Sequence, residues 1–300
     1  MLRRLIVRSE VWPLSRPFRI SRGVKTAAEV MLVQISEGAC VGRGESVPYA
    51  RYGESTTSVL AEIESVRAAL EAGMTRQALQ TALPPGAARN AIDCALWDLE
   101  ANLAGRSVAQ MAGVAVPESI ATAVTVSLAA PAEMGTAAAA LASAPLIKVK
   151  VDANDPLEKV AAVRAAAPNA RLIIDPNESW SFDLLRRVLP DLAALDAHLI
   201  EQPLPAAEDE TLEGFASPVP ICADESAHTH ADLDRIARRY QAVNIKLDKA
   251  GGLTQALVMQ RRAKELGLAT MVGCMVCTSL GVAPALLLAG DAAFVDLDGP

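Results

Sequence analysis

Aromatic side chains are scarce in this sequence and make up only 3% of its 300 residues. This scarcity disfavours a surface built on aromatic stacking, while the abundance of alanine, leucine and valine favours close packing of helices against a sheet. Positive charge is not in excess either, because the net charge is −7. The chain therefore has no basic field that would attract nucleic acid or an anionic membrane.

Long apolar runs are also lacking. No stretch approaches the roughly 18 continuous apolar residues of a membrane span, and the opening MLRRLIVRSEVWPL has no apolar core of a secretory signal. The cysteines are odd in number and scattered, which favours reduced thiols over a disulfide framework. We therefore expect a cytoplasmic protein. The five cysteines are Cys40, Cys94, Cys222, Cys274 and Cys277.

Residues 1–115 predict a small α+β capping domain. Three apolar, β-branched runs are typical of strands, and two longer segments have the three-to-four spacing of helices with one buried face. The expected strands are Leu2–Arg8, Ala28–Ser36 and Cys40–Glu45, and the expected helices are Ser55–Ala72 and Gly86–Leu103. The buried stripe of the second helix comprises Ile92, Leu96, Leu99 and Leu103.

Residues 116–300 alternate between short apolar runs and alanine-rich helical segments. From Lys150 to Lys246, charged residues close these runs at intervals of 22 to 26 residues. The alternation predicts parallel β/α units, and eight of them close a barrel. The expected fold is thus a modified TIM barrel with an N-terminal α+β cap. The eight expected strands are Ile120–Ser127, Leu146–Val151, Arg171–Asp175, His198–Glu201, Val219–Asp224, Ala242–Leu247, Leu268–Gly273 and Ala293–Asp296.

Charged residues end most of these strands, at the place where barrel enzymes have their active sites. A single charge there usually caps a helix or faces solvent. Charges on five successive strands and again on the eighth are hard to explain in that way, so they predict one ionisable cluster in the barrel mouth. The residues are Lys148, Lys150, Asp175, Glu201, Asp224, Lys246, Asp296 and Asp298.

Asp175, Glu201 and Asp224 come from neighbouring strands and should converge on one side of the mouth. Three carboxylates at close quarters stay ionised together only beside a cation. Their hard oxygen donors suit Mg²⁺, and no thiolate or imidazole accompanies them as zinc would prefer. The sequence therefore predicts a Mg²⁺ site made by these three carboxylates.

Lys150 and Lys246 lie four strands apart in a ring of eight, so they should face each other across the barrel axis. Two amines on opposite sides of one carbon can each act as a base on one face and an acid on the other, which inverts a stereocentre. A lysine acts as a base only when its pKa is lowered, which a metal ion or the adjacent Lys148 would do.

Several short sequence motifs of the chain match a known pattern. The lysines and carboxylates, together with LIKVKVD, EQPLP, ICADES and NIKLDKAGGLT, resemble the muconate-lactonising branch of the enolase superfamily. The ending VDLDGP resembles the dipeptide epimerases of that branch. PYARYGES, GAARNAIDCALWDLE and GCMVCTS resemble them too, so the resemblance covers nearly the whole chain.

The resemblance implies Mg²⁺-dependent epimerisation of a dipeptide through an enolate, with an Ala-Glu dipeptide of murein recycling as the expected substrate. It implies that the three carboxylates ligate Mg²⁺. It also implies that Lys150 and Lys246 are the acid/base pair, and that Lys148 stabilises the enolate oxygen.

For the rest of the substrate, the resemblance implies that Asp296 and Asp298 bind the α-ammonium of the dipeptide. Strand eight is expected across the barrel from the metal, so a substrate with its carboxylate at the metal would place its amine there. Arg22, in a loop of the small domain, is the candidate for binding a side-chain carboxylate.

Other functions on the same site stay open. An o-succinylbenzoate synthase or cycloisomerase is disfavoured by Asp296 and Asp298, because its anionic substrate has no ammonium to pair with them. An N-acylamino acid racemase is a further alternative. A non-enzymatic barrel would be favoured by the loss of a ligand or lysine, and none is lost. The sequence leaves open the side-chain specificity, a homo-oligomer, and the packing of the end at Pro300, beyond which the family continues.

Overall fold

Eight parallel strands form one nearly closed barrel in the computed structural model, which describes residues 3–300. Their order in the sheet follows the sequence from β4 to β11. The first and last strands meet where the amide of Ala123 donates to the carbonyl oxygen of Val295 at 2.7 Å. The predicted barrel is confirmed. Its strands are β4 (Val124–Val126), β5 (Leu146–Lys150), β6 (Arg171–Asp175), β7 (Ala197–Glu201), β8 (Ile221–Ala223), β9 (Ala242–Lys246), β10 (Ala269–Gly273) and β11 (Phe294–Asp296).

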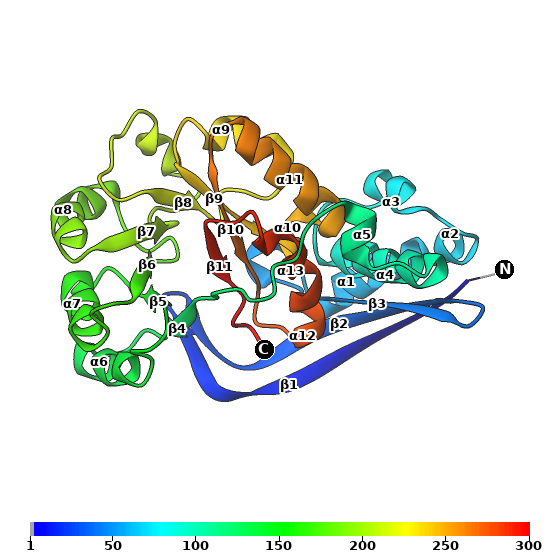
Figure 1. Ribbon diagram of the computed structural model, residues 1–300, viewed down its shortest axis with the longest axis horizontal. Helices are drawn as coiled ribbons and strands as arrows, with labels where there is room; N and C mark the ends of the chain where they lie inside the picture. Colours follow the sequence, from blue (N-terminus) through cyan, green and yellow to red (C-terminus); the bar gives the residue numbers. More distant parts are fainter. Residues whose placement is uncertain (1–2) are drawn as a thin grey trace.

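Helices cover the outside of the barrel and connect its strands (Figure 1). The strands are nearly continuous apolar runs, because the side chains of a parallel barrel strand are buried on both faces. The helices are α6 (Pro131–Ala139), α7 (Pro156–Ala166), α8 (Phe182–Ala194), α9 (Leu233–Ile236), α10 (Leu247–Ala250), α11 (Leu253–Glu265), α12 (Ser279–Val282) and α13 (Leu286–Ala289), with 3₁₀ turns η2 (Asp209–Leu212), η3 (His230–Asp232) and η4 (Ala283–Ala285).

The N-terminal cap has a three-stranded antiparallel sheet in the order β1-β2-β3. The hairpin of β1 and β2 runs from the cap along the barrel (Figure 1). There the amide of Leu128, just after β4, donates to the carbonyl oxygen of Arg19 at 3.1 Å. The elements of the cap are β1 (Arg4–Ile20), β2 (Gly23–Glu37), β3 (Cys40–Ser46), η1 (Ala50–Tyr52), α1 (Thr56–Ser65), α2 (Arg67–Glu71), α3 (Arg76–Ala82), α4 (Ala87–Ala104) and α5 (Val108–Ala112).

The hairpin is much longer than the sequence predicted. The expected first strand began at Leu2, which lies outside the described residues, and ended at Arg8, whereas β1 continues to Ile20. Pro13 and polar neighbours hide the strand pattern in this segment, and the pairing with β2 shifts register between Pro13 and Phe18. β1 is an edge strand, where proline costs no ladder hydrogen bond.

The helices of the cap also differ in part from the prediction. The first expected helix is divided into α1 and α2, and α3 and α5 were not predicted. Ile92, Leu96 and Leu99 are fully buried on α4, as expected. The burial predicted for Leu103 is wrong, because the last turn of α4 is exposed and this side chain is 45% accessible.

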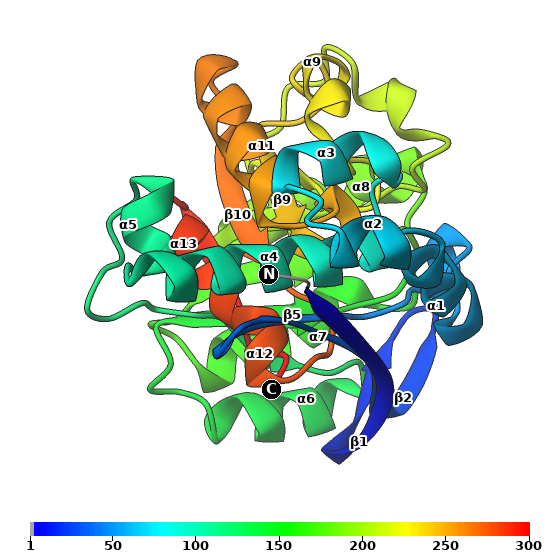
Figure 2. The same cartoon turned by 90° about the vertical axis from the view of Figure 1, so that its right-hand side faces the viewer.

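Helix α4 lies between the cap sheet and the barrel (Figure 2). It approaches β3 so closely that a Cβ atom on Gly44 would lie 2.1 Å from the carbonyl oxygen of Ala91. Its other side meets the barrel through buried polar groups. Arg89 Nη2 donates to the carbonyl oxygen of Ala250 at 2.8 Å, and Asp93 Oδ2 accepts from the amide of Thr254 at 2.9 Å. Side chains of α4 therefore hold α10 and α11.

The division of the chain at residue 115 stays a prediction, and that residue lies between α5 and β4. All five cysteines are free thiols. Among the described helices, none is long and apolar enough to cross a membrane.

Candidate active site

Three buried carboxylates lie at one side of the barrel mouth. Asp175 ends β6, Glu201 ends β7, and Asp224 follows β8 directly. Their exposed fractions are 0%, 0% and 2%. Because β6, β7 and β8 are neighbours in the sheet, the structure brings together the three side chains that the sequence singled out as metal ligands.

Lys148 lies at the centre of this cluster. Its Nζ is 3.0 Å from Oδ2 of Asp175 and 2.7 Å from Oε2 of Glu201. It is also 2.8 Å from Oδ2 of Asp296, on the eighth strand. Strand eight, β11, lies four strands from β7 in the ring, so it is across the barrel from Glu201 as expected. The Lys148 ammonium, which projects from β5, nevertheless contacts Asp296 as well as Asp175 and Glu201.

Lys150 and Lys246 end β5 and β9, which are four strands apart. Lys150 Nζ donates to Oδ2 of Asp175 at 2.6 Å, and Lys246 Nζ donates to Oδ2 of Asp224 at 2.7 Å. Each lysine is thus held at one of the outer carboxylates of the cluster. The two lysines therefore lie on opposite sides of the three carboxylates.

The cluster strongly perturbs its own ionisation. Burial and the neighbouring Asp175 raise the pKa of Glu201 to about 7. Burial opposes ionisation of Asp175 too, but Lys150 and Lys148 outweigh it and lower that pKa to about 2. For Lys246, desolvation by burial acts to lower the pKa, but the combined attraction of Asp224 and Glu201 outweighs it, and the pKa lies well above its ordinary value. The carboxylates alone therefore shift this lysine away from the lowered pKa that a base requires.

The donor set has the chemistry of a site for a hard divalent cation, since it consists of carboxylate oxygens. Within residues 3–300, no three carboxylate, histidine or cysteine side chains are spaced as a ready-made metal cluster, and lysine ammonium groups contact all three carboxylates here. Oε2 of Glu201 is buried. The Lys148 ammonium lies 2.7 Å from it, but no group among these residues meets this oxygen with the geometry of a normal hydrogen bond. A buried carboxylate oxygen left in this state fits a cation better than a purely structural role.

The two aspartates of the eighth strand differ in their surroundings. Asp296 is 5% exposed, and in the described part of the chain its Oδ1 has no hydrogen-bond partner. Asp298 is exposed, and its Oδ2 accepts from the amide of Thr125 at 2.8 Å. Although the residue is exposed, neighbouring protein atoms partly desolvate its carboxylate, and this desolvation and the nearby Asp296 raise the pKa of Asp298 above its ordinary value. Both carboxylates remain available for a cation brought by a substrate.

Arg22 lies in the turn between β1 and β2 and reaches the barrel. Its Nη2 is 2.6 Å from Oε1 of Glu225, and its Nη1 donates to the carbonyl oxygen of Asn177 at 2.9 Å and to Glu178 at 3.2 Å. Arg51, in η1, binds the same Glu178 with two nitrogens, at 2.9 and 2.8 Å. Two loops of the cap therefore hold the loop that follows Asp175.

Several polar residues that support the cluster were missed from the sequence. Asn244 Nδ2 donates to Oε1 of Glu201 at 2.8 Å. Gln202 Oε1 accepts from the amide of Asp224 at 2.9 Å. Gln202 lies directly after the predicted ligand Glu201, and Asn244 lies two residues before the predicted base Lys246. This spacing was the one sequence signal that could have identified them.

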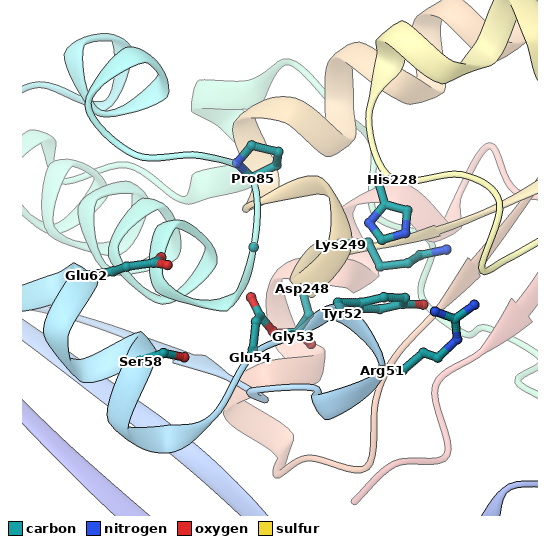
Figure 3. Close-up of a pocket in the computed structure, with 11 residues that line it drawn as sticks. Arg51, Tyr52, Gly53, Glu54, Ser58, Glu62, Pro85, His228, Asp248 and Lys249 are labelled. Atoms are coloured by element: carbon teal, nitrogen blue, oxygen red, sulfur yellow. The ribbon is translucent and has the colours of Figure 1, made fainter. Parts of the chain in front are cut away.

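A cavity of about 500 Å³ borders the site where η1 and the start of α1 meet α10 (Figure 3). Tyr52 and His228 stack edge to face in its wall, with ring centroids 4.5 Å apart. Lys249 lies beside them, with its amine directed toward the barrel (Figure 3). Asp248 and Lys249 of α10 therefore both border this cavity, while the charged end of Lys249 belongs to the barrel mouth.

A capped barrel with this lysine and carboxylate set defines a member of the enolase superfamily. Residues 2–113 match the N-terminal domain of the mandelate racemase / muconate lactonizing enzyme family, and residues 133–296 match its enolase C-terminal domain-like part. The chain belongs to this family, and the resemblance inferred from its motifs is confirmed.

Individual relatives narrow the comparison. The L-Ala-D/L-Glu epimerase of Escherichia coli (strain K12) is 48% identical over 100% of this chain and 94% of its own length. An N-acetyl-D-glutamate racemase from a Pseudoalteromonas species is 47% identical over 90% of this chain and 86% of its own length.

Solved structures similar to this chain also include dipeptide epimerases and their relatives. An enolase family member from Agrobacterium tumefaciens with homology to dipeptide epimerases, which has bound sodium and L-Ala-L-Glu, superposes with a TM-score of 0.97 at 50% identity and covers 99% of this chain and 91% of its own. A dipeptide epimerase from Enterococcus faecalis was crystallised with Mg and L-Leu-L-Tyr, with a TM-score of 0.92 at 27% identity over 100% of this chain and 91% of its own.

Proposed function

We propose that this chain is a dipeptide epimerase that inverts the α-carbon beside the carboxylate of the glutamyl residue in L-Ala-D/L-Glu, a fragment of murein peptide. The observation that carries the proposal is the placement of Lys150 and Lys246 at the ends of strands four apart, on either side of three buried carboxylates. The identity of 48% with an L-Ala-D/L-Glu epimerase supports it. In this proposal residues 1–115 form the cap and residues 116–300 the barrel.

Asp175, Glu201 and Asp224 would hold Mg²⁺. When bound, the ion would supply a positive charge with three effects. The charge would offset these carboxylates, attract the carboxylate of the substrate and lower the pKa of nearby lysines. Relatives crystallised with Mg and a dipeptide support this choice of ion. The donors come from three adjacent strands, so the barrel itself fixes their spacing.

The chain's own residues carry the proton. One lysine of the pair, in its neutral form, takes the α-proton on its Nζ, and the other, as an ammonium, gives a proton to the opposite face of the same carbon. Lys148, with its charge at the centre of the cluster, would hold the oxygen on which negative charge develops. The reverse reaction exchanges the roles of Lys150 and Lys246, so both epimers are substrates.

The cap and the eighth strand would hold the rest of the dipeptide. Asp296 and Asp298 would bind the α-ammonium, for which the free Oδ1 of Asp296 is suited. Arg22 would bind the side-chain carboxylate of the glutamyl residue. Such binding requires the guanidinium to exchange part of its present contact with Glu225 and Glu178 for the substrate.

Incubation of L-Ala-L-Glu with the protein and Mg²⁺ in D₂O tests the proposal. We expect L-Ala-D-Glu to appear and deuterium to enter the glutamyl α-carbon of both epimers. Chromatography on a chiral phase and proton NMR measure these two outcomes. If neither deuterium exchange nor the second epimer appears with Mg²⁺ present, the proposed function is wrong.

A second candidate is racemisation of an N-acylated glutamate, favoured by the 47% identity with an N-acetyl-D-glutamate racemase. The chemistry at the α-carbon would be the same, and the two functions differ at the amine. An acylated amine has no positive charge for Asp296 and Asp298 to bind. The ratio of kcat/KM for L-Ala-L-Glu to that for N-acetyl-glutamate therefore decides between them.

A further inference from the structure

Lys249 lies three residues after Lys246, and the roles described so far leave it unused. It is 2% exposed, on α10. Its Nζ lies 2.6 Å from Oδ1 of Asp224, donates also to the carbonyl oxygen of Asp224, and donates to the carbonyl oxygen of Asn244 at 3.1 Å. The three N–H groups of the ammonium thus have three acceptors. A lysine is buried in this way only when its charge is paired.

Asp224 lies between two ammonium groups. Its Oδ1 contacts Lys249 and its Oδ2 contacts Lys246, at 2.6 and 2.7 Å. Its backbone amide is held by Gln202 at 2.9 Å. These contacts fix both the main chain and the rotation of the carboxylate. Because Lys249 binds Oδ1, the other oxygen, Oδ2, is directed toward Lys246.

We propose that Lys249 is a positioning residue, which holds Asp224 in the orientation that Mg²⁺ binding and the proton transfers of Lys246 both require. Lys249 acts through Asp224 and need not touch the substrate. The inference rests on the proposed function in one respect, the role of Asp224 as a metal ligand.

The loss of Lys249 would have a directional effect. Oδ1 of Asp224 would be left buried without the ammonium of Lys249. The carboxylate would then turn toward Lys246, whose ammonium would be left of the pair. Mg²⁺ would then bind less tightly, and proton exchange at the face served by Lys246 would slow more than exchange at the face served by Lys150. A lysine that merely stabilises the core would change thermal stability without either effect.

Titration calorimetry with Mg²⁺ on two variants tests this. Lys249→Met keeps the length of the side chain and removes its charge. The matched control is Lys159→Met, because Lys159 is also buried, at 7% exposure, and pairs with Asp152 at 2.6 Å. We expect Lys249→Met to weaken Mg²⁺ binding by about 10- to 100-fold, the range for losing a partner of a metal ligand, and Lys159→Met to leave it unchanged.

Deuterium exchange of each epimer gives the second measurement, and the epimer whose proton Lys246 removes should be the slower one in Lys249→Met. If Lys249→Met does not fold, Lys249→Gln is measured with the same expectations. Wild-type affinity for Mg²⁺ in a folded Lys249 variant, or an equal loss in Lys159→Met, would overturn the proposal. A wild-type protein that binds Mg²⁺ but epimerises no dipeptide would instead defeat the proposed function, because the calorimetry needs no turnover.

Discussion

Lys148 and Asp296 form a 2.8 Å ion pair that joins the second barrel strand to the eighth. The same ammonium contacts Asp175 and Glu201, so a change at Asp296 also alters the surroundings of the proposed metal ligands. Asp298 has no ion pair with Lys148 in the described structure and its Oδ2 accepts only a backbone amide, that of Thr125. It is therefore the cleaner position for testing how the amine of a substrate is bound.

Asp298→Asn should lower kcat/KM for L-Ala-L-Glu by about 10- to 1,000-fold, or about 1.4 to 4 kcal/mol, the range for disturbing a charged pair. The amide oxygen of asparagine can still accept from Thr125, so the fold should be kept. N-acetyl-glutamate carries no ammonium, and its kinetics should change far less. Steady-state kinetics on both substrates measure the difference. An equal loss for both would contradict the assignment and favour the N-acylamino acid racemase.

Removal of divalent metal should abolish epimerisation, and added Mg²⁺ should restore it, because without the ion the three carboxylates pair with lysines that the reaction needs. Mg²⁺ should also raise the melting temperature, since at 100 times its Kd a ligand of the folded state adds about 2.7 kcal/mol of stability. Activity assays after EDTA treatment and thermal scans check both effects. Full activity of the chelated protein would exclude the metal site.

Lys150→Ala and Lys246→Ala should each abolish net epimerisation, because inversion needs a proton donor and a proton acceptor on opposite faces. Each variant should still exchange the α-proton of at most one epimer with D₂O, and the two variants should differ in which epimer that is. Proton NMR of both epimers in D₂O measures the exchange. A single variant with near-normal epimerisation would rule out the two-lysine mechanism.

Asp93, on α4, should make stability depend on pH. Burial raises its pKa to about 6, against about 3.9 in an unfolded chain. Between these values the folded protein binds the extra proton, so the contribution of this site to stability is largest below about pH 4 and falls as the pH rises to about 6. The unfolding free energy of the wild type relative to Asp93→Asn should therefore fall by about 2 kcal/mol from pH 4 to 7.

Urea unfolding of both proteins at several pH values measures this difference, and comparison with the variant cancels the other titrating groups. A difference that stays constant with pH would show that Asp93 does not titrate in this range.

Gly44→Ala should destabilise the cap by about 3 kcal/mol, because the new methyl group would lie 2.1 Å from a backbone oxygen of α4. Gly135→Ala is the control. There the Cβ would meet its nearest atom at 3.4 Å, and alanine is the better residue inside the helix α6, by about 0.5 to 1 kcal/mol. Denaturant titration compares the two, and a Gly44→Ala protein as stable as Gly135→Ala would contradict the close approach of α4 and β3.

The barrel was largely predictable from the sequence, because each strand is an apolar run and most of these runs end in a charged residue. Those residues mark the open ends of parallel strands, and their spacing follows from the length of one β/α unit. The long hairpin was not predictable in the same way. Its outer part is a half-exposed edge that contains Pro13 and Pro17, so neither apolar alternation nor the usual absence of proline identifies it as a strand.

The supporting residues of the site were harder to predict than the charged residues at strand ends. Lys249, Asn244 and Gln202 lie beside those residues in sequence, but polar residues near strand ends are usually solvated or cap helices. What sets these apart is burial and the partner that each one meets. Both depend on how the barrel closes and where the cap packs, and one sequence does not reveal either.

Helix α4 has a consequence for how the chain could be divided. Arg89, Asn90 and Trp97 donate to α10, α11 and the turn between them, more than 150 residues away in the sequence. A cut between cap and barrel would expose polar groups on each piece that only the other piece can satisfy. The two fragments should be poorly soluble when expressed alone and should reassociate when expressed together. The cap could be transplanted onto another barrel only if the residues that receive α4 were carried over with it.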